Sequence, residues 1–149
     1  MSQAMGVRST KKHFLVFLLV LSLVILEPIE AFSELKKWQI HVVNGLSNGQ
    51  TLFVHCKSKD NDLGEHNLNS GTEFNWTFRV NLWNTTLFWC YLHKPDGKSA
   101  SFDVFWVEKK SIWLFYRCYH SNCIWTAKDD GIYLRDNPVQ RDILVHEWK

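Results

Sequence analysis

The stretch TEFNWTFRV, residues Thr72 to Val80, alternates polar and apolar side chains from Glu73 onward. Phe74, Trp76 and Phe78 fall on one face of an extended chain, and polar residues fall on the other. Successive side chains of a β-strand point to opposite faces, so this period of two predicts a strand with one buried and one solvated face. The stretch shows no helical periodicity. A chain built from such stretches is expected to be a β-protein.

Segments rich in β-branched and aromatic residues recur along the chain, separated by Asn-Gly and Asp-Gly turn signals. Their number and spacing predict an all-β fold, an antiparallel β-sandwich of about eight short strands. Besides residues 72–80, the expected strands are Trp38–Val43, Thr51–Lys57, Thr86–His93, Ser101–Val107, Ile112–Arg117, Cys123–Lys128, Gly131–Arg135 and Ile143–Trp148.

Three segments call for separate interpretation. Thr86–His93 is apolar on both faces, which favours a central position in its sheet. Lys57–Ser70 is polar and without periodicity, so we expect a long surface loop there. The apolar run Ser111–Tyr116 would suggest a partner site if exposed and another strand if buried. We favour the buried strand, because large exposed apolar patches are uncommon on monomers.

The first 33 residues have the pattern of a secretory signal peptide. Arg8, Lys11 and Lys12 precede the apolar run Phe14–Leu26, whose thirteen residues are too few for the roughly twenty that span a bilayer. Small residues within 31–33 predict cleavage before Glu34. We therefore expect residues 1–33 to be a cleaved leader, residues 34–149 to be one secreted extracellular domain, and no stable membrane insertion after cleavage.

The charge of the chain argues against a nucleic-acid partner. Seventeen basic and fifteen acidic residues give a net charge of +2, and removal of the leader leaves 14 basic and 13 acidic residues. A nearly neutral domain gives no electrostatic reason to bind nucleic acid or anionic lipid.

All four cysteines, Cys56, Cys90, Cys118 and Cys123, lie in the expected mature domain. An even number in a secreted chain predicts two disulfides, and three pairings are compatible with four cysteines. We favour Cys56–Cys123 with Cys90–Cys118, because the neighbouring Cys118 and Cys123 could each tie one segment to a different strand.

Two sequons predict N-linked glycans. They are Asn75-Trp76-Thr77, on the solvated face of the expected strand Thr72–Val80, and Asn84-Thr85-Thr86, at an expected turn. Both positions have room for a sugar chain.

Metal and catalytic motifs are weak in this sequence. Cys118, His120 and Cys123 lack the second ligand pair of a zinc site, so neither a metal nor another cofactor is expected. The chain end, His146 to Lys149, looks like part of an active-site motif of secreted plant ribonucleases, whose paired histidines share acid–base work. Only one histidine is present in that motif here, and no catalytic residue or enzymatic activity is expected.

Several blocks of the sequence, in their order and spacing, resemble the plant self-incompatibility protein family, the S-protein homologues. The blocks are Val54–Gly64 (VHCKSKDNDLG), Trp76–Phe78 (WTF), Thr85–Cys90 (TTLFWC), Ser101–Phe105 (SFDVF), Cys123–Trp125 (CIW) and Asp130–Leu134 (DGIYL). The resemblance covers nearly all of the expected mature domain.

This resemblance implies a small secreted β-sandwich with two disulfides and no enzymatic activity. It implies a recognition ligand in cell–cell signalling, such as the rejection of self pollen by the pistil, with an unknown cell-surface receptor as partner and a monomeric state. Recognition would use the loops Lys57–Asn69 and Leu92–Ala100, while Trp76, Trp89 and Trp125 would fill the core. A secreted defence protein with weak ribonuclease-like or antimicrobial activity is the alternative.

Overall fold

The computed structural model describes residues 11–20, 36–108 and 112–149, and the chain divides into units of residues 1–35 and 36–149. Residues 11–20 form a helix. Among the described residues, no helix is long and apolar enough to cross a membrane. The expected cleavage site at residues 31–33 lies outside the described residues, so the leader stays a prediction.

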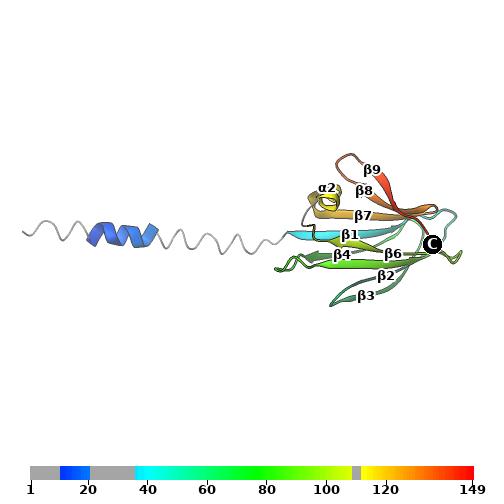
Figure 1. Ribbon diagram of the computed structural model, residues 1–149, viewed down its shortest axis with the longest axis horizontal. Coiled ribbons are helices and arrows are strands. Elements are labelled where there is room, and N and C mark those ends of the chain that lie inside the picture. The colour runs from blue at the N-terminus through cyan, green and yellow to red at the C-terminus, as the bar shows by residue number, and fades with distance from the viewer. Residues whose placement is uncertain (1–10, 21–35, 109–111) are drawn as a thin grey trace, which may run out of the picture. The chain divides into compact units, whose positions relative to one another are not determined.

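Residues 36–108 and 112–149 contain nine strands arranged in two sheets, which confirms the predicted β-sandwich (Figure 1). Eight of the nine expected strands are present, the one expected at 112–117 is absent, and an unexpected one lies at 62–68. The strands are β1 (Lys37–Asn44), β2 (Leu52–Ser58), β3 (Asp62–Leu68), β4 (Glu73–Arg79), β5 (Leu87–His93), β6 (Ser99–Trp106), β7 (Asn122–Lys128), β8 (Gly131–Asp136) and β9 (Arg141–His146).

The strand orders are β4-β1-β7-β8-β9 in the five-stranded sheet and β3-β2-β5-β6 in the four-stranded sheet. β5 lies between β2 and β6, which confirms its expected central position. The expectation of a purely antiparallel fold was wrong at one pair, because β1 and β7 run parallel. Parallel neighbours need a long connection, and here the whole four-stranded sheet and β4 lie between them in the sequence.

Aromatic side chains from both sheets fill the core between them. Trp125 on β7 is fully buried, its ring centroid is 5.3 Å from that of Phe102 on β6, and its indole N–H donates a 3.0 Å hydrogen bond to the Val104 carbonyl. The aromatic row of β4 faces this core, as the alternation predicts. Trp76 and Trp125 therefore have the expected core positions. Trp89 does not: it alternates with buried neighbours on β5 and is half-buried on the outer face.

The expectation of a long loop over Lys57–Ser70 was wrong, because this segment contains β3. β3 pairs with β2 at the edge of the four-stranded sheet and leaves most of its residues exposed or half-buried. An edge strand with little buried surface needs few apolar side chains, so the hydrophobic pattern that marks other strands is missing. Gly64, with φ of +83°, further interrupts the regular pattern.

The segment 112–117 is not a strand. It forms the short helix α2 (Trp113–Arg117), followed by the 3-10 helix η1 (Tyr119–Ser121). The Glu108 carboxylate accepts hydrogen bonds from the backbone N–H groups of Leu114 and Phe115, at 2.9 and 3.1 Å. These bonds satisfy donors that a helix start leaves free. Only Leu114 of the helix is buried, while Ile112 is 70% exposed.

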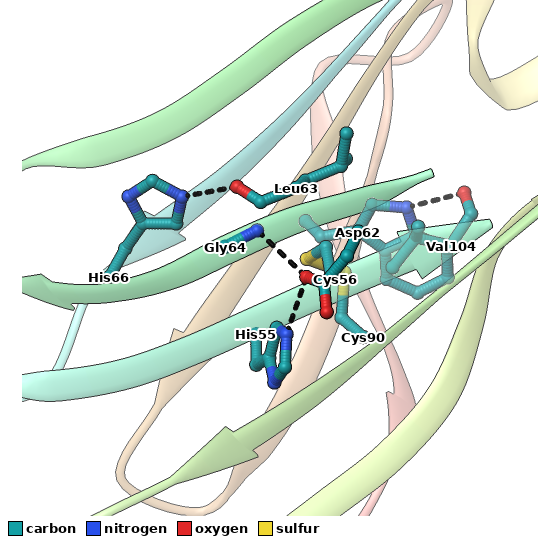
Figure 2. Close-up of a disulfide and its surroundings, with 9 residues drawn as sticks. His55, Cys56, Asp62, Leu63, Gly64, His66, Cys90 and Val104 are labelled. Atoms are coloured by element: carbon teal, nitrogen blue, oxygen red, sulfur yellow. Dashed lines mark hydrogen bonds and ion pairs between the residues drawn. A yellow bond between two sulfur atoms is a disulfide. The ribbon is translucent and has the colours of Figure 1, made fainter. Parts of the chain in front are cut away.

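The expected disulfide pairing was also wrong. The structure pairs Cys56 with Cys90 and Cys118 with Cys123. Cys56 and Cys90 are direct register partners on β2 and β5, and their disulfide joins these two neighbouring strands (Figure 2). Side chains directly opposite on antiparallel strands point to the same face, so these two sulfurs meet. Cys118 and Cys123 instead close the tight connection from α2 through η1 to β7.

Candidate recognition surface

The loop between β4 and β5 exposes two large apolar side chains. Leu82 is 63% exposed and Trp83 is 83% exposed. Isolated surface leucines are ordinary, but a tryptophan is seldom left so open to water. An exposed tryptophan on a loop is typical of a protein contact site, since tryptophan often contributes strongly to binding at interfaces.

Asn81 holds this loop in shape. Its Oδ1 accepts a 2.9 Å hydrogen bond from the Thr85 backbone N–H, and its Nδ2 donates one of 2.9 Å to Thr85 Oγ1. The Asn81 backbone N–H donates to Thr86 Oγ1 at 2.9 Å. Its carbonyl accepts from the Asn84 N–H at 3.0 Å. The loop is therefore an ordered turn that projects Leu82 and Trp83, and such preorganisation lowers the entropy cost of binding.

A pocket lies beside this loop. Its volume is about 520 Å³, and its walls come from the β2–β3 turn, the end of β4, the β4–β5 loop and the start of β5. The β2–β3 turn is closed by a 2.8 Å hydrogen bond from the Ser58 N–H to the Asn61 carbonyl. The Asn61 N–H donates in return to Ser58 Oγ at 3.1 Å. Both rims of the pocket are thus tight, hydrogen-bonded turns.

Lys59, Asp60 and Arg79 line the pocket, and none of them forms an ion pair within the described residues. The next cation, Lys57, lies 3.1 Å from Asp62 and is neutralised by it. The charges at the pocket are therefore available to a bound molecule, with one more positive than negative group.

Asp62 organises the outer face of the β2–β3 hairpin. Its Oδ1 accepts hydrogen bonds from the Gly64 N–H at 2.9 Å and lies 2.7 Å from Nε2 of His55 (Figure 2). The Gly64 hydrogen bond first, then those of His55 and Lys57, hold the pKa of the Asp62 carboxyl well below its usual range. These contacts fix the hairpin beside the pocket.

Of the two expected recognition loops, only part of the first reaches the pocket. Within Lys57–Asn69, the turn residues 58–61 line it, and most of the rest is β3. Leu92–Ala100 contains a tight turn at the opposite end of β5, where the buried Lys94 ammonium lies 3.1 Å from both Asp96 Oδ2 and the Asp129 carbonyl. The β4–β5 loop was not among the expected recognition loops, although the Leu-Trp pair between Asn81 and Asn84 is visible in the sequence.

Both sequon asparagines are exposed. Asn75 lies on the outer face of β4, where its Nδ2 donates a 2.9 Å hydrogen bond to Glu73. Asn84 lies in the bend next to Trp83, with φ of 52°. Both side chains are accessible to a sugar chain, and glycosylation stays a prediction.

His146, the candidate of the ribonuclease-like interpretation, packs inward. Its ring centroid is 4.7 Å from that of Phe102 and 6.1 Å from that of Trp125. Burial lowers the pKa of His146. In the part of the chain that the structure describes, no hydrogen bond or ring contact joins it to a second histidine. The arrangement is that of a core-packing ring.

The metal-site candidate of the sequence is a disulfide in the structure. Cys118 and Cys123 are bonded to each other, which leaves no thiolate to bind zinc beside His120. Across residues 11–20, 36–108 and 112–149, no group of three His, Cys, Asp or Glu side chains could hold a metal ion.

Comparison with known proteins shows which family the chain is related to. Residues 39–148 match the family model of plant self-incompatibility protein S1. The chain belongs to the plant self-incompatibility protein S1 family. S-protein homolog 74 of Arabidopsis thaliana is 47% identical to it over 116 residues, which cover 78% of this chain and 74% of that protein.

Two further members of the S1 family extend the comparison. Self-incompatibility protein S1 of Papaver rhoeas is 32% identical over 108 residues, which cover 72% of this chain and 75% of that one. A solved structure of an SPH (self-incompatibility protein homologue) protein, described as one of a widespread family of small, highly stable, secreted plant proteins, shares the fold. Its TM-score is 0.59 at 18% identity, with 76% of this chain and 96% of that chain covered.

Proposed function

We propose that this protein is secreted and acts outside the cell as a non-enzymatic ligand, recognised by a cell-surface receptor through the β4–β5 loop. The ordered, exposed Leu82-Trp83 pair carries this proposal. Membership of the S1 family supports it, since a solved member is described as secreted. Rejection of self pollen, the role that the name of the poppy relative indicates, is one form such signalling could take.

Binding of the purified, fluorescently labelled protein to intact plant protoplasts tests the existence of a receptor. We expect saturable binding that unlabelled protein displaces and that trypsin treatment of the cells abolishes. Binding that rises linearly with concentration and survives trypsin would contradict the proposal. Reduced and alkylated protein, which lacks the two disulfides, serves as the control for nonspecific adsorption.

The pollen role has its own assay. Purified protein is added to germinating pollen of genotypes that carry or lack the matching allele, and tube growth is measured. Inhibition of the matching genotype alone supports pollen rejection. Equal growth of both genotypes, together with saturable binding to other cells, would assign the ligand to another signalling process.

A further inference from the structure

The pocket between the β2–β3 turn and the β4–β5 loop offers an aromatic wall beside polar groups. Trp89 is half-buried on the outer face of β5 and lines the pocket together with Phe78 and Phe88. The volume of about 520 Å³ lies in the range that holds small organic ligands, roughly 300–1,000 Å³. An aromatic ring next to convergent polar groups suits a molecule with one apolar face and many polar substituents.

The polar groups of this pocket are mainly hydrogen-bond donors. Lys59 and Arg79 bring two cations that form no ion pair with any carboxylate in residues 11–20, 36–108 and 112–149. The hydroxyls of Thr85 and Thr86 each accept one hydrogen bond from Asn81, so their own protons stay available to donate into the pocket. Asp60 supplies the single carboxylate acceptor. A ligand that matches this set carries a carboxylate and several hydroxyl groups.

We propose that this pocket binds a uronic-acid-containing saccharide. The sugar ring packs its apolar C–H face against Trp89, and its carboxylate pairs with Arg79 and Lys59. The threonine hydroxyls donate to sugar oxygens, and Asp60 accepts from sugar hydroxyls. This site is separate from the Leu82-Trp83 contact, and it would retain the protein on acidic extracellular polysaccharide while the loop tip stays free for a protein receptor.

Isothermal titration calorimetry with a galacturonic acid trimer tests the proposal. The protein is secreted from plant cells and treated with an endoglycosidase, so that no sugar chain at Asn84 crowds the pocket. We expect measurable heat with the acidic trimer, and about tenfold weaker binding of the neutral galactose trimer, since one lost charge-assisted contact typically costs that much. Equal binding of both trimers, no binding of the acidic trimer, or equally tight binding of inorganic phosphate would each overturn the assignment.

Matched variants locate the site. Arg79→Met removes a pocket charge and keeps an unbranched apolar side chain, and Arg141→Met removes an exposed charge on β9, at the opposite edge of the same sheet. We expect the first to weaken trimer binding about tenfold and the second to change it less than about twofold. Unfolding midpoints confirm that both variants are folded. Equal affinity of the two variants would refute the site.

Trp83→Ala should retain trimer binding, so failure of the saccharide site and failure of receptor recognition can be told apart.

Discussion

A single side chain, that of Asn81, shapes the β4–β5 loop. Its amide nitrogen and its amide oxygen each form a hydrogen bond with Thr85. Hydrogen bonds inside the loop hold its shape, so Leu82 and Trp83 need not pack on the core and are exposed to solvent. Exposed apolar side chains do not stabilise the isolated monomer. Their burial against a partner is favourable, because it removes apolar surface from water. The recognition that we propose therefore depends on one amide that positions two apolar side chains.

Asp62 makes the stability of the domain depend on pH. Its pKa is depressed below the ordinary 3.8, so its contribution is complete above that value and is lost as pH falls toward the folded-state pKa. Asp62→Asn keeps an acceptor for the Gly64 N–H but removes the charge. We expect it to lower the melting temperature at pH 6 and to differ less and less from the native protein between about pH 5 and pH 2.

Asp60→Asn is the control for this prediction, since Asp60 is an exposed carboxylate without an ion pair among the described residues. It should leave the melting temperature nearly unchanged across the same pH range. A deficit of Asp62→Asn that stays constant down to pH 2 would show that the charge is not the stabilising feature.

His146 is expected to stabilise the core rather than to cleave RNA. His146→Phe keeps a ring against Phe102 and Trp125, whereas His146→Ala removes it. We expect the alanine variant to lose about 1–2 kcal/mol of unfolding free energy in urea and the phenylalanine variant to lose less. The native protein should release no nucleotides from RNA. RNA cleavage that His146→Phe abolishes would restore the ribonuclease alternative.

At the scale of elements, the two disulfides should differ in their contribution to stability. Cys56–Cys90 closes a loop with a sequence separation of 34, and Cys118–Cys123 one of 5. The chain-entropy model gives about 4 kcal/mol for the first and about 2 kcal/mol for the second. Urea unfolding of the Cys56→Ala/Cys90→Ala and Cys118→Ala/Cys123→Ala variants should show the larger loss in the first pair. The reverse order would contradict this account.

The sequence predicted those elements that bury an alternating face, and missed those that do not. The β4 pattern was decisive because its aromatic residues pack on the core. β3 was missed because an edge strand needs little apolar surface. α2 was mistaken for a strand because one helical turn is too short for its apolar residues to show a period. Disulfide pairing depends on which strands are neighbours, and cysteine spacing does not contain that information.

The recognition surface was only partly predictable for a related reason. Its walls come from two turns that are distant in the sequence and adjacent only in the fold. The resemblance indicated the first turn within Lys57–Asn69, and the structure adds the β4–β5 loop. No local pattern could show that Arg79 and Lys59 line the same pocket.

At the scale of the whole molecule, the residues that stabilise the domain are separate from the proposed recognition surface. The core and the two disulfides hold the sandwich together, and the exposed Leu82-Trp83 loop and the pocket beside it lie at one end of β5. A nearly neutral net charge leaves local contacts, rather than long-range attraction, to determine partner choice.

The affinity of Trp83→Ala for intact protoplasts tests whether the β4–β5 loop binds the receptor, with Tyr116→Ala as the control. Tyr116 on α2 is also an exposed aromatic residue, at 50%, but lies outside the β4–β5 loop. We predict that Trp83→Ala raises the dissociation constant at least about tenfold, a typical effect for a central tryptophan, and that Tyr116→Ala changes it less than about twofold. Unchanged binding of folded Trp83→Ala would contradict recognition through this loop.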